Sequence, residues 1–418
     1  PASINRLTAE LGFPDDETTA RAPMKYRLRL IRLADQLLRF SDVEIDSINR
    51  CDQPGEGLIG RPVGVAGMHF CSGIRCPMAL FDLRSTLKMV VFGGNQALRH
   101  GNLLERIGFG ATANVWLTLM SGRHMKLVDQ SRAAFIDLLA RLEKRPAGKT
   151  TAEIRSGLAF VDVMAMRWSD VPESVDACVG DLQADVQPLR LEIPQTRWLR
   201  LWADWHLGRW TEMRAMALEM AQDSNRRGDT FQRIVSTTGY GGNAFLLSDD
   251  QKQIDQFLGG ESLRSDTGEV EFIEFFQWMR SVQCALYSGE YEAAARMVSQ
   301  MRQAIRQSLI RRVPIVQVIL DFLTALASLH MRQAQALLRK EERRRSGTGF
   351  LSASVVRNAV RRLENQSFDF ARMLAALLRG IDRRVVGKET DASEAFRSAA
   401  ELASDLGLTP YQLAAEDG

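Results

Sequence analysis

The sequence predicts an all-α fold, arranged as an α-solenoid of stacked antiparallel helix pairs. Apolar residues recur at the helical spacing i, i+3, i+4, i+7 in one segment after another, as at Leu30, Leu33, Ala34, Leu37 and Leu38. Alternating runs of useful length, which are typical of strands, are missing. The chain has 418 residues, whereas a single hydrophobic core stops growing near roughly 250–300 residues. A stacked array of helices accommodates this length because it needs no single centre.

Clusters of Gly and Pro, which interrupt helices, divide the chain into three regions. We expect an N-terminal helical segment over residues 1–50, a Gly/Pro-rich irregular loop over 51–77, and a helical repeat domain over 78–418. The predicted helices span residues 25–40, 78–100, 103–120, 127–144, 150–167, 172–186, 195–207, 211–227, 229–247, 250–258, 269–288, 291–310, 314–330, 332–345, 352–365, 368–380 and 391–406.

Recurring turns support a repeat architecture. At four places a helix is followed by Gly and then by a large apolar residue that opens the next helix. These glycines are Gly101, Gly208, Gly289 and, with a weaker continuation, Gly380. Gly ends a helix well because it adopts the left-handed conformation at little cost. We expect Trp210 and Tyr291 to pack back onto the helix just left, with Ala294 as the small residue that permits close helix approach.

The segment from Leu286 to Ala294 resembles the turn between the two helices of a tetratricopeptide repeat. From residue 78 to the end, the chain resembles the helical repeat region that follows the catalytic domain in some large bacterial serine/threonine protein kinases. The resemblance rests on the order of Trp205 to Trp210, Asn225 to Asp229, Gly289 to Tyr291, Arg311 to Pro314 and the Ala-rich helix from Ala392 to Leu406. It implies a sensor or regulatory scaffold in signal transduction.

The chain lacks the residues that catalyse phosphoryl transfer. It contains no Gly-rich kinase loop, no V-A-I-K lysine, no H-R-D loop and no D-F-G. The segment Pro146 to Thr151 ends like a P-loop, but Glu143 occupies the position of the first glycine and a helix precedes it. We therefore predict a non-catalytic protein-interaction scaffold without a cofactor.

Two other functions remain open. The same fold would serve as the sensor region of a signalling ATPase or of a transcriptional activator. A zinc-dependent enzyme using the loop 51–77 is the third reading, because Cys51, His69, Cys71 and Cys76 have the right composition for tetrahedral zinc. Their spacing lacks a C-x-x-C knuckle, so no metal site is predicted and buried free thiols are the alternative.

The best candidate for a partner-binding surface is a tryptophan stripe. Trp198, Trp202 and Trp205 fall at i, i+4, i+7 on one helical face. Trp and Arg are the residue types that dominate binding energy at interfaces. Arg311 and Arg312 could contact acidic residues, so we expect a partner with an aromatic or aliphatic anchor followed by acidic side chains. The alternative is that all three indoles pack between helices.

Composition limits the partners and the compartment. The net charge is only +3, which gives no bulk electrostatic case for nucleic acid. Residues 296–384 carry 18 Lys or Arg against 6 Asp or Glu, whereas residues 249–292 carry 3 against 10. This asymmetry favours an acidic protein or peptide, or self-association. No apolar run reaches the roughly 18 charge-free residues of a membrane span, and the nearest candidate, Val313 to Leu329, carries Asp321. Five cysteines form no disulfide framework, so we expect a reducing cytoplasm.

Overall fold

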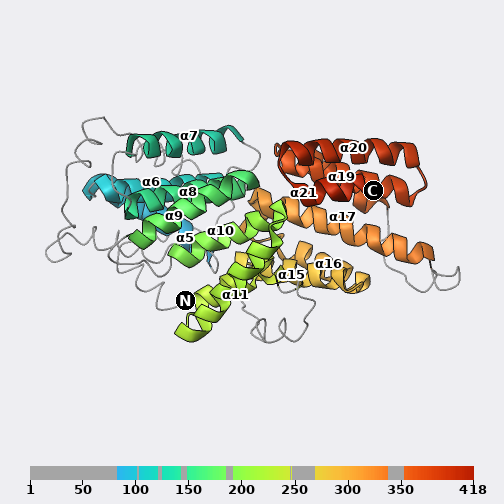
Figure 1. Cartoon of the computed structure of the whole chain (residues 1–418), viewed down its shortest axis with the longest axis horizontal. Helices are drawn as coiled ribbons and strands as arrows, with labels where there is room; N and C mark the ends of the chain where they lie inside the picture. The colour runs from blue at the N-terminus through green and yellow to red at the C-terminus, as the bar shows by residue number, and fades with distance from the viewer. Residues whose placement is uncertain are drawn as a thin grey trace. The chain divides into compact units, whose positions relative to one another are not determined.

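The computed structural model describes residues 82–100, 103–120, 125–142, 148–184, 192–244, 246, 269–337 and 353–418. Within these ranges the regular structure consists of sixteen α-helices and two short 3-10 helices, with no strand (Figure 1). The prediction of an all-α chain is therefore confirmed. The predicted segments 1–50 and 51–77, the helix 250–258 and the turn at Gly101 lie outside the described residues.

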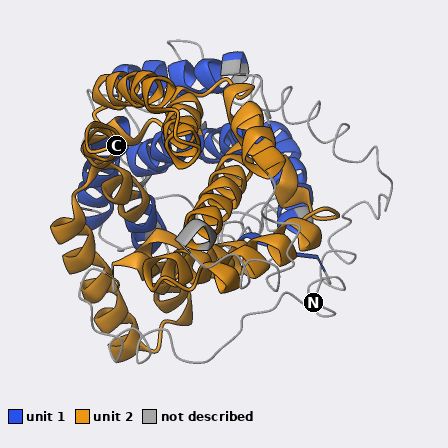
Figure 2. Ribbon diagram, turned by 90° about the vertical axis from the view of Figure 1, so that its right-hand side faces the viewer, with its two compact units in different colours: residues 1–164, 170–199, 264–272 blue, residues 165–169, 200–263, 273–418 orange. Residues whose placement is uncertain are grey.

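The chain divides into two compact units (Figure 2). Unit 1 comprises residues 1–164, 170–199 and 264–272, and unit 2 comprises residues 165–169, 200–263 and 273–418. The helices of unit 1 are α5 (Leu83–His100), α6 (Leu103–Met120), α7 (Met125–Leu142), α8 (Lys149–Met164), α9 (Val171–Ala184) and the first half of α10 (Glu192–Leu207). In α8, Ile154, Leu158 and Val161 form the buried stripe that helical periodicity requires.

Unit 2 contains the rest of the described helices. They are the second half of α10, α11 (Trp210–Arg227), α12 (Thr230–Thr237), α13 (Gly239–Asn243), α15 (Phe272–Tyr287, apart from Phe272), α16 (Tyr291–Ala304), α17 (Pro314–Leu337), α18 (Ala353–Glu364), α19 (Asp369–Val385), α20 (Glu389–Asp405) and α21 (Thr409–Glu416). The 3-10 helix Leu309–Arg312 precedes α17, and another, Trp168–Asp170, follows α8.

Helix α17 is the packing centre of the C-terminal part of unit 2. It contacts α16, α18 and α19. The segment Pro314–Ala334 is long and apolar enough to cross a membrane, but 78% of its most apolar window is buried inside the structure. Burial of that extent is what a central packing helix requires, since its apolar surface is covered by neighbouring helices.

Some predicted boundaries are wrong. The predicted helices 314–330 and 332–345 are continuous through residue 331, because no Gly or Pro stands between them to stop a helix. Within the predicted helix 229–247 the sequence indicates a break at the glycine-rich segment 239–243, and the helix is indeed interrupted just before it, at Thr238, which has extended backbone. Helix α19 passes through Gly380, where a turn was expected, and ends at Val385. Helix α21 was not predicted at all.

The turns at Gly208 and Gly289 share one geometry. Both glycines have a φ of 75°, and the amide of the next residue donates to the carbonyl five residues earlier, Arg209 to Asp204 and Glu290 to Ala285. This is the Schellman arrangement that ends helices. A Cβ on Gly208 would also lie 2.8 Å from the Pro410 ring, so this turn needs glycine for its conformation and for close approach of α21.

At Gly380 the absence of a side chain allows α19 and α20 to pack closely. A Cβ there would lie 2.5 Å from the ring of Phe396 in α20. The turn between α19 and α20 occurs instead at Gly387, which has a φ of 74°. A helix-internal glycine that permits close approach and a glycine that ends a helix look alike in the sequence.

Replacing Ala294 with Arg is expected to lower the free energy of unfolding by roughly 3 kcal/mol or more. Ala294 is fully buried in α16, so the new side chain would both overpack the interior and bury a charge. The neighbouring Tyr291 is partly exposed, and its ring stacks on His330 of α17 at 4.9 Å. Urea unfolding should show no comparable loss for Ala304→Arg, at an exposed position of the same helix. Equal midpoints for the two variants would refute this packing.

Candidate functional site: an aromatic cavity in unit 2

Unit 2 encloses a cavity of about 440 Å³ between side chains of α10, α11, α13, α15, α17, α19 and α21. The described residues that line it are aromatic and aliphatic apart from His206 and Gln283, and they include no Asp, Glu, Lys or Arg. The volume falls within the range of roughly 300–1,000 Å³ that is typical of ligand sites. The described part of the chain therefore contains a preformed, uncharged and largely apolar site.

The tryptophan stripe of α10 supplies one wall and part of the core. Trp198 and Trp202 are buried, with exposed fractions of 6% and 1%, and neither lines the cavity. The ring of Trp202 packs edge-on against Tyr240 and Phe276, with centroids 5.1 Å and 4.9 Å away. Trp205 is partly exposed and lines the cavity. Of the three predicted residues, only Trp205 is placed to meet a ligand.

Trp210 lines the cavity too, although the sequence indicated only a turn residue. Its indole N–H donates to the carbonyl of Trp205 at 3.1 Å, and the two rings lie 6.2 Å apart. The Trp210 side chain opens α11 directly after the Gly208 turn and stays 41% exposed. The short Gly208 turn thus places two indoles from consecutive helices on one wall.

Tyr240 reaches the cavity through the glycine-rich helix α13. The Trp205 ring stacks on it at 5.7 Å. A Cβ on Gly242 would lie 2.5 Å from the Arg280 side chain of α15, so glycine at this position allows α13 to lie close to α15. Asn243 donates to Gln283 of α15 at 2.7 Å. The helix break that the sequence indicated at this place therefore positions an aromatic side chain.

His206 is the main polar group of the cavity and is enclosed by rings. It stacks on Trp168 at 4.2 Å, and Tyr240 and Phe370 contact it edge-on at 4.7 Å and 5.0 Å. Its Nδ1 shares a hydrogen bond of 2.7 Å with the hydroxyl of Tyr411. Its Nε2 is buried and has no hydrogen-bond partner among the described residues. A buried polar atom without a partner is costly, and no contact with a described residue satisfies Nε2.

Burial keeps these groups neutral. It lowers the pKa of His206 from 6.5 to about 3. It also raises the pKa of Tyr240 and of Tyr411 above the ordinary value for a phenol. At neutral pH the cavity therefore carries no charge, and it can donate or accept hydrogen bonds without transferring a proton.

His206 is poorly matched to general-base catalysis. A general base works best with a pKa near the operating pH, and burial moves that of His206 far below it. Among the described residues, no Ser, Cys, Lys or carboxylate lines the cavity as a nucleophile or as a second acid–base group. We therefore interpret the cavity as a recognition site for an apolar group that carries a hydrogen-bonding atom.

The charged residues near the stripe are engaged elsewhere or lie away from the cavity. The Nε of Arg200 donates to both oxygens of the fully buried Asp204 at 2.8 Å, so Arg200 serves this ion pair. Arg311 and Arg312 are exposed and form no ion pair within the described part of the chain. Nη1 of Arg311 donates to the carbonyl of Arg306 at 2.6 Å. Neither arginine lines the cavity.

The structure does not test the zinc candidate of the sequence, and the P-loop-like segment is described only from Gly148 on. Cys51, His69, Cys71 and Cys76 lie outside the described residues, and the residues described include no cluster of three metal-ligating side chains. Burial raises the pKa of Cys178 to about 12, so its thiol stays protonated. In the P-loop-like segment, the Gly148 amide donates to the Thr151 hydroxyl at 3.2 Å, an interaction that caps α8.

The residues that complete the cavity were not predicted from the sequence. The scattered histidines indicated only capping or packing, and nothing local marks Tyr411, which lies 205 positions beyond its partner His206. No protein-family model, no curated protein and no solved structure matches this chain.

Proposed function

We propose that this chain is a non-catalytic interaction scaffold, and that the aromatic cavity of unit 2 receives an aromatic or long aliphatic side chain of a protein partner. The observation that carries the proposal is the uncharged aromatic cavity with a partnerless Nε2 of His206 in its wall. Apolar walls supply affinity by burying the anchor, and a single hydrogen-bonding atom supplies orientation.

The exposed aromatic residues beside the cavity support a protein partner. Trp210 and Tyr287 are 41% and 63% exposed, and both line the cavity. Trp and Tyr are enriched where binding energy concentrates, because each buries a large area with few rotatable bonds. A bound peptide would cover these two rings while its anchor enters the cavity.

The solenoid architecture and the kind of protein that this chain serves are also part of the proposal. Stacked antiparallel helix pairs would form the α-solenoid. The chain would act as the regulatory region of a bacterial serine/threonine kinase, since it resembles the helical repeat region of such kinases. A sensor region of a signalling ATPase or of a transcriptional activator is the alternative setting. Arg311 and Arg312 stay proposed contacts for acidic residues that follow the anchor, since both side chains are exposed.

Selection from a random peptide library tests this function. Peptides selected on the wild-type chain are expected to share an aromatic or long aliphatic residue, and to lose at least about tenfold in affinity towards Ala414→Trp. Ala414 is exposed and lines the cavity, so an indole at this position would occupy the cavity without entering the core. Ala414→Ser is the matched control. Selected peptides that bind both variants equally would contradict the proposal.

A free small molecule is the second candidate occupant. The cavity volume and the buried Nε2 of His206 favour it, because both are typical of small-ligand sites. Enrichment of no peptide, together with tight binding of an aromatic compound that is lost in Ala414→Trp, would favour this candidate.

A further inference from the structure

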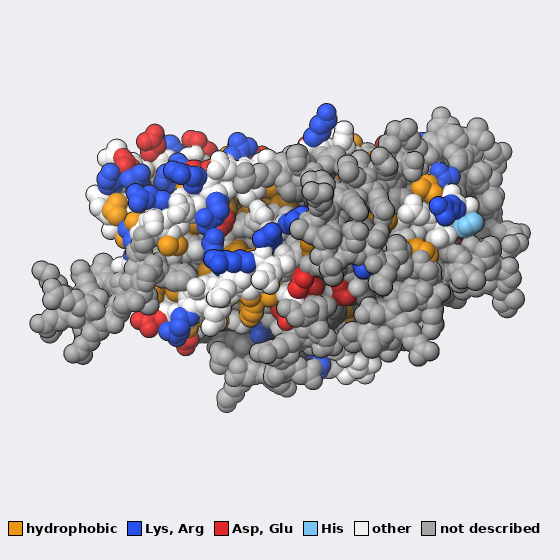
Figure 3. Space-filling view, turned by 180° about the vertical axis from the view of Figure 1, so that it is seen from behind, with side chains coloured by type: hydrophobic (Ala, Val, Ile, Leu, Met, Phe, Trp, Pro, Cys, Tyr) orange, Lys and Arg blue, Asp and Glu red, His pale blue; other side chains and the backbone are white. Residues whose placement is uncertain are grey.

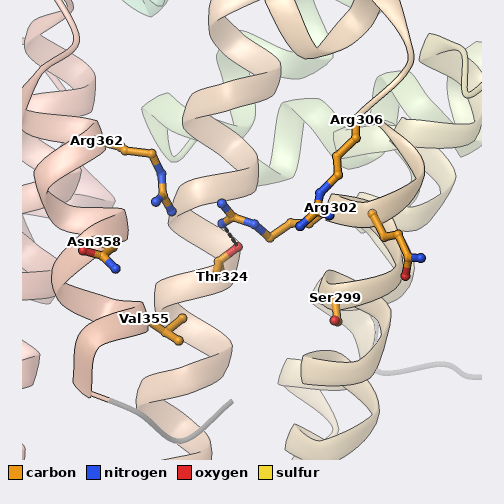
Figure 4. Close-up of a pocket in the computed structure, with 8 residues that line it drawn as sticks. Ser299, Arg302, Arg306, Thr324, Val355, Asn358 and Arg362 are labelled. Atoms are coloured by element: carbon orange, nitrogen blue, oxygen red, sulfur yellow. Dashed lines mark hydrogen bonds between the residues drawn. The ribbon is translucent and has the colours of Figure 1, made fainter. Parts of the chain in front are cut away.

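A second cavity in unit 2 is basic. It measures about 330 Å³ and lies between α16, α17 and α18. Figure 4 shows the side chains of Arg302 and Arg362 extending from different helices towards the space between them, with Arg306 beside Arg302. Ser299 and Asn358 add hydrogen-bonding groups to the lining, and no carboxylate is found among the described lining residues. In the half of Figure 3 that holds the C-terminal helices, Lys and Arg side chains gather at the surface.

One buried carboxylate orients two of the three guanidinium groups. Asp321 of α17 is 6% exposed and accepts hydrogen bonds of 2.9 Å from Nε of Arg362 on both its oxygens. It also accepts one of 3.1 Å from Nη1 of Arg302, and that Nη1 contacts Thr324 Oγ1 at 3.0 Å. Arg306 is exposed and forms no ion pair within the described residues. Two guanidinium groups are thus held in place before any ligand arrives.

The cluster has an excess of positive charge. Among the described residues, three arginines are paired with Asp321 alone, which leaves two positive charges uncompensated. Burial is the main cause that lowers the pKa of Arg302, and Asp321 opposes it, but repulsion by Arg362 and Arg306 lowers it further. The arginines are therefore close enough to destabilise one another, and an anion between them would relieve that repulsion.

We propose that this cavity binds a phosphate monoester group. Such a group carries about −1.5 to −2 charges at neutral pH, which matches the two uncompensated charges of the cluster. Its oxygens accept paired hydrogen bonds from guanidinium groups, whose planar donors suit phosphate better than an ammonium does. Arg302 and Arg362 hold the group from opposite helices, Arg306 closes the exposed side, and Ser299 and Asn358 contact the remaining oxygens.

This site is independent of the aromatic cavity. Asp321 and Thr324 hold the arginines, whereas Phe322 and Leu326 line the aromatic cavity. At 3.6 residues per turn, these two pairs point to opposite sides of α17. The two cavities can therefore be occupied, and tested, separately.

Calorimetric titration of the full chain with inorganic phosphate at constant ionic strength tests the site. Binding is expected to be saturable, and to weaken about tenfold or more in Arg306→Gln, which removes a charged donor that no described contact needs for folding. Arg357→Gln is the matched control, because Arg357 is exposed on α18 and does not line the cavity. It should bind phosphate within about twofold of the wild type.

The pH dependence of the affinity and a comparison of two phosphorylated ligands provide further tests. The affinity for a phosphate monoester should fall as the pH drops below about 6, where the monoester becomes a monoanion while the arginines stay charged. Tighter binding of a phosphoserine peptide than of adenosine monophosphate would identify a modified protein as the source, and the reverse would identify a small phosphorylated metabolite. The proposal is wrong if phosphate binds no better than acetate, or if Arg306→Gln and Arg357→Gln bind phosphate equally.

Discussion

Replacing Trp202 with Ala is expected to lower the free energy of unfolding by about 3–5 kcal/mol, the largest single effect that we predict. The indole is 1% exposed and is held edge-on between Tyr240 and Phe276. Its removal would leave a void lined by rings from α13 and α15, which cannot close it without moving their own helices. Such a void costs the lost transfer free energy and the lost contacts together.

The matched comparison is Trp205→Ala, three residues along the same helix. Trp205 is partly exposed and faces the aromatic cavity, so its loss should cost at most about half as much stability. Denaturant unfolding of the two variants measures the difference. If Trp205→Ala proved the more destabilising of the two, the assignment of Trp202 to the core and of Trp205 to the site would be reversed.

The stability of the chain is expected to fall by about 2 kcal/mol between about pH 7 and pH 5 through His206 alone. Burial lowers its pKa to about 3, against 6.5 for an ordinary histidine. The unfolded chain therefore binds a proton on this residue between the two values, and the folded chain does not. Stability from His206 is complete above pH 6.5 and is lost progressively as the pH falls towards 3.

The control is His206→Gln, which cannot titrate but can still share a hydrogen bond with Tyr411. The groups that surround His206 are Trp168, Phe370, Tyr240 and Tyr411, and burial raises the pKa of both tyrosines, so they stay neutral in this range. Burial also raises the pKa of Asp204, so this residue stabilises the folded state as the pH falls. It does so equally in the wild type and in His206→Gln. Identical slopes of unfolding free energy against pH in both proteins would contradict the buried neutral state of His206.

Helical features that depend on local sequence were predictable. The all-α fold follows from apolar periodicity, and the turn at Gly289 follows from a glycine between two periodic segments. Features that depend on distant neighbours were not. Gly380 looks like a turn residue, yet its role is set by Phe396 of the next helix. The prediction ended a helix at residue 330 although no Gly or Pro stands there, and α17 in fact continues to Leu337.

In the candidate site, too, local sequence predicted some features, and distant neighbours determined the others. The spacing of Trp198, Trp202 and Trp205 identifies one helical face, but it cannot tell which indole another helix covers. That depends on Phe276 and Tyr240, which follow in the chain by dozens of residues. Tyr411 lies in a short helix near the C-terminus, and only the fold places it within 2.7 Å of His206. The sequence could therefore indicate the tryptophans as candidates but not the histidine as their polar partner.

Binding of N-acetyl-tryptophanamide, which carries an indole and two peptide groups, tests most directly that the aromatic cavity is a recognition site. Calorimetric titration of the wild-type chain should be saturable with one site. The affinity should fall at least about tenfold in Ala414→Trp, and should be unchanged in Ala414→Ser and in Arg306→Gln, whose side chain lies at the other cavity. Titrations without saturation, or with equal affinity for the wild type and Ala414→Trp, would contradict the account.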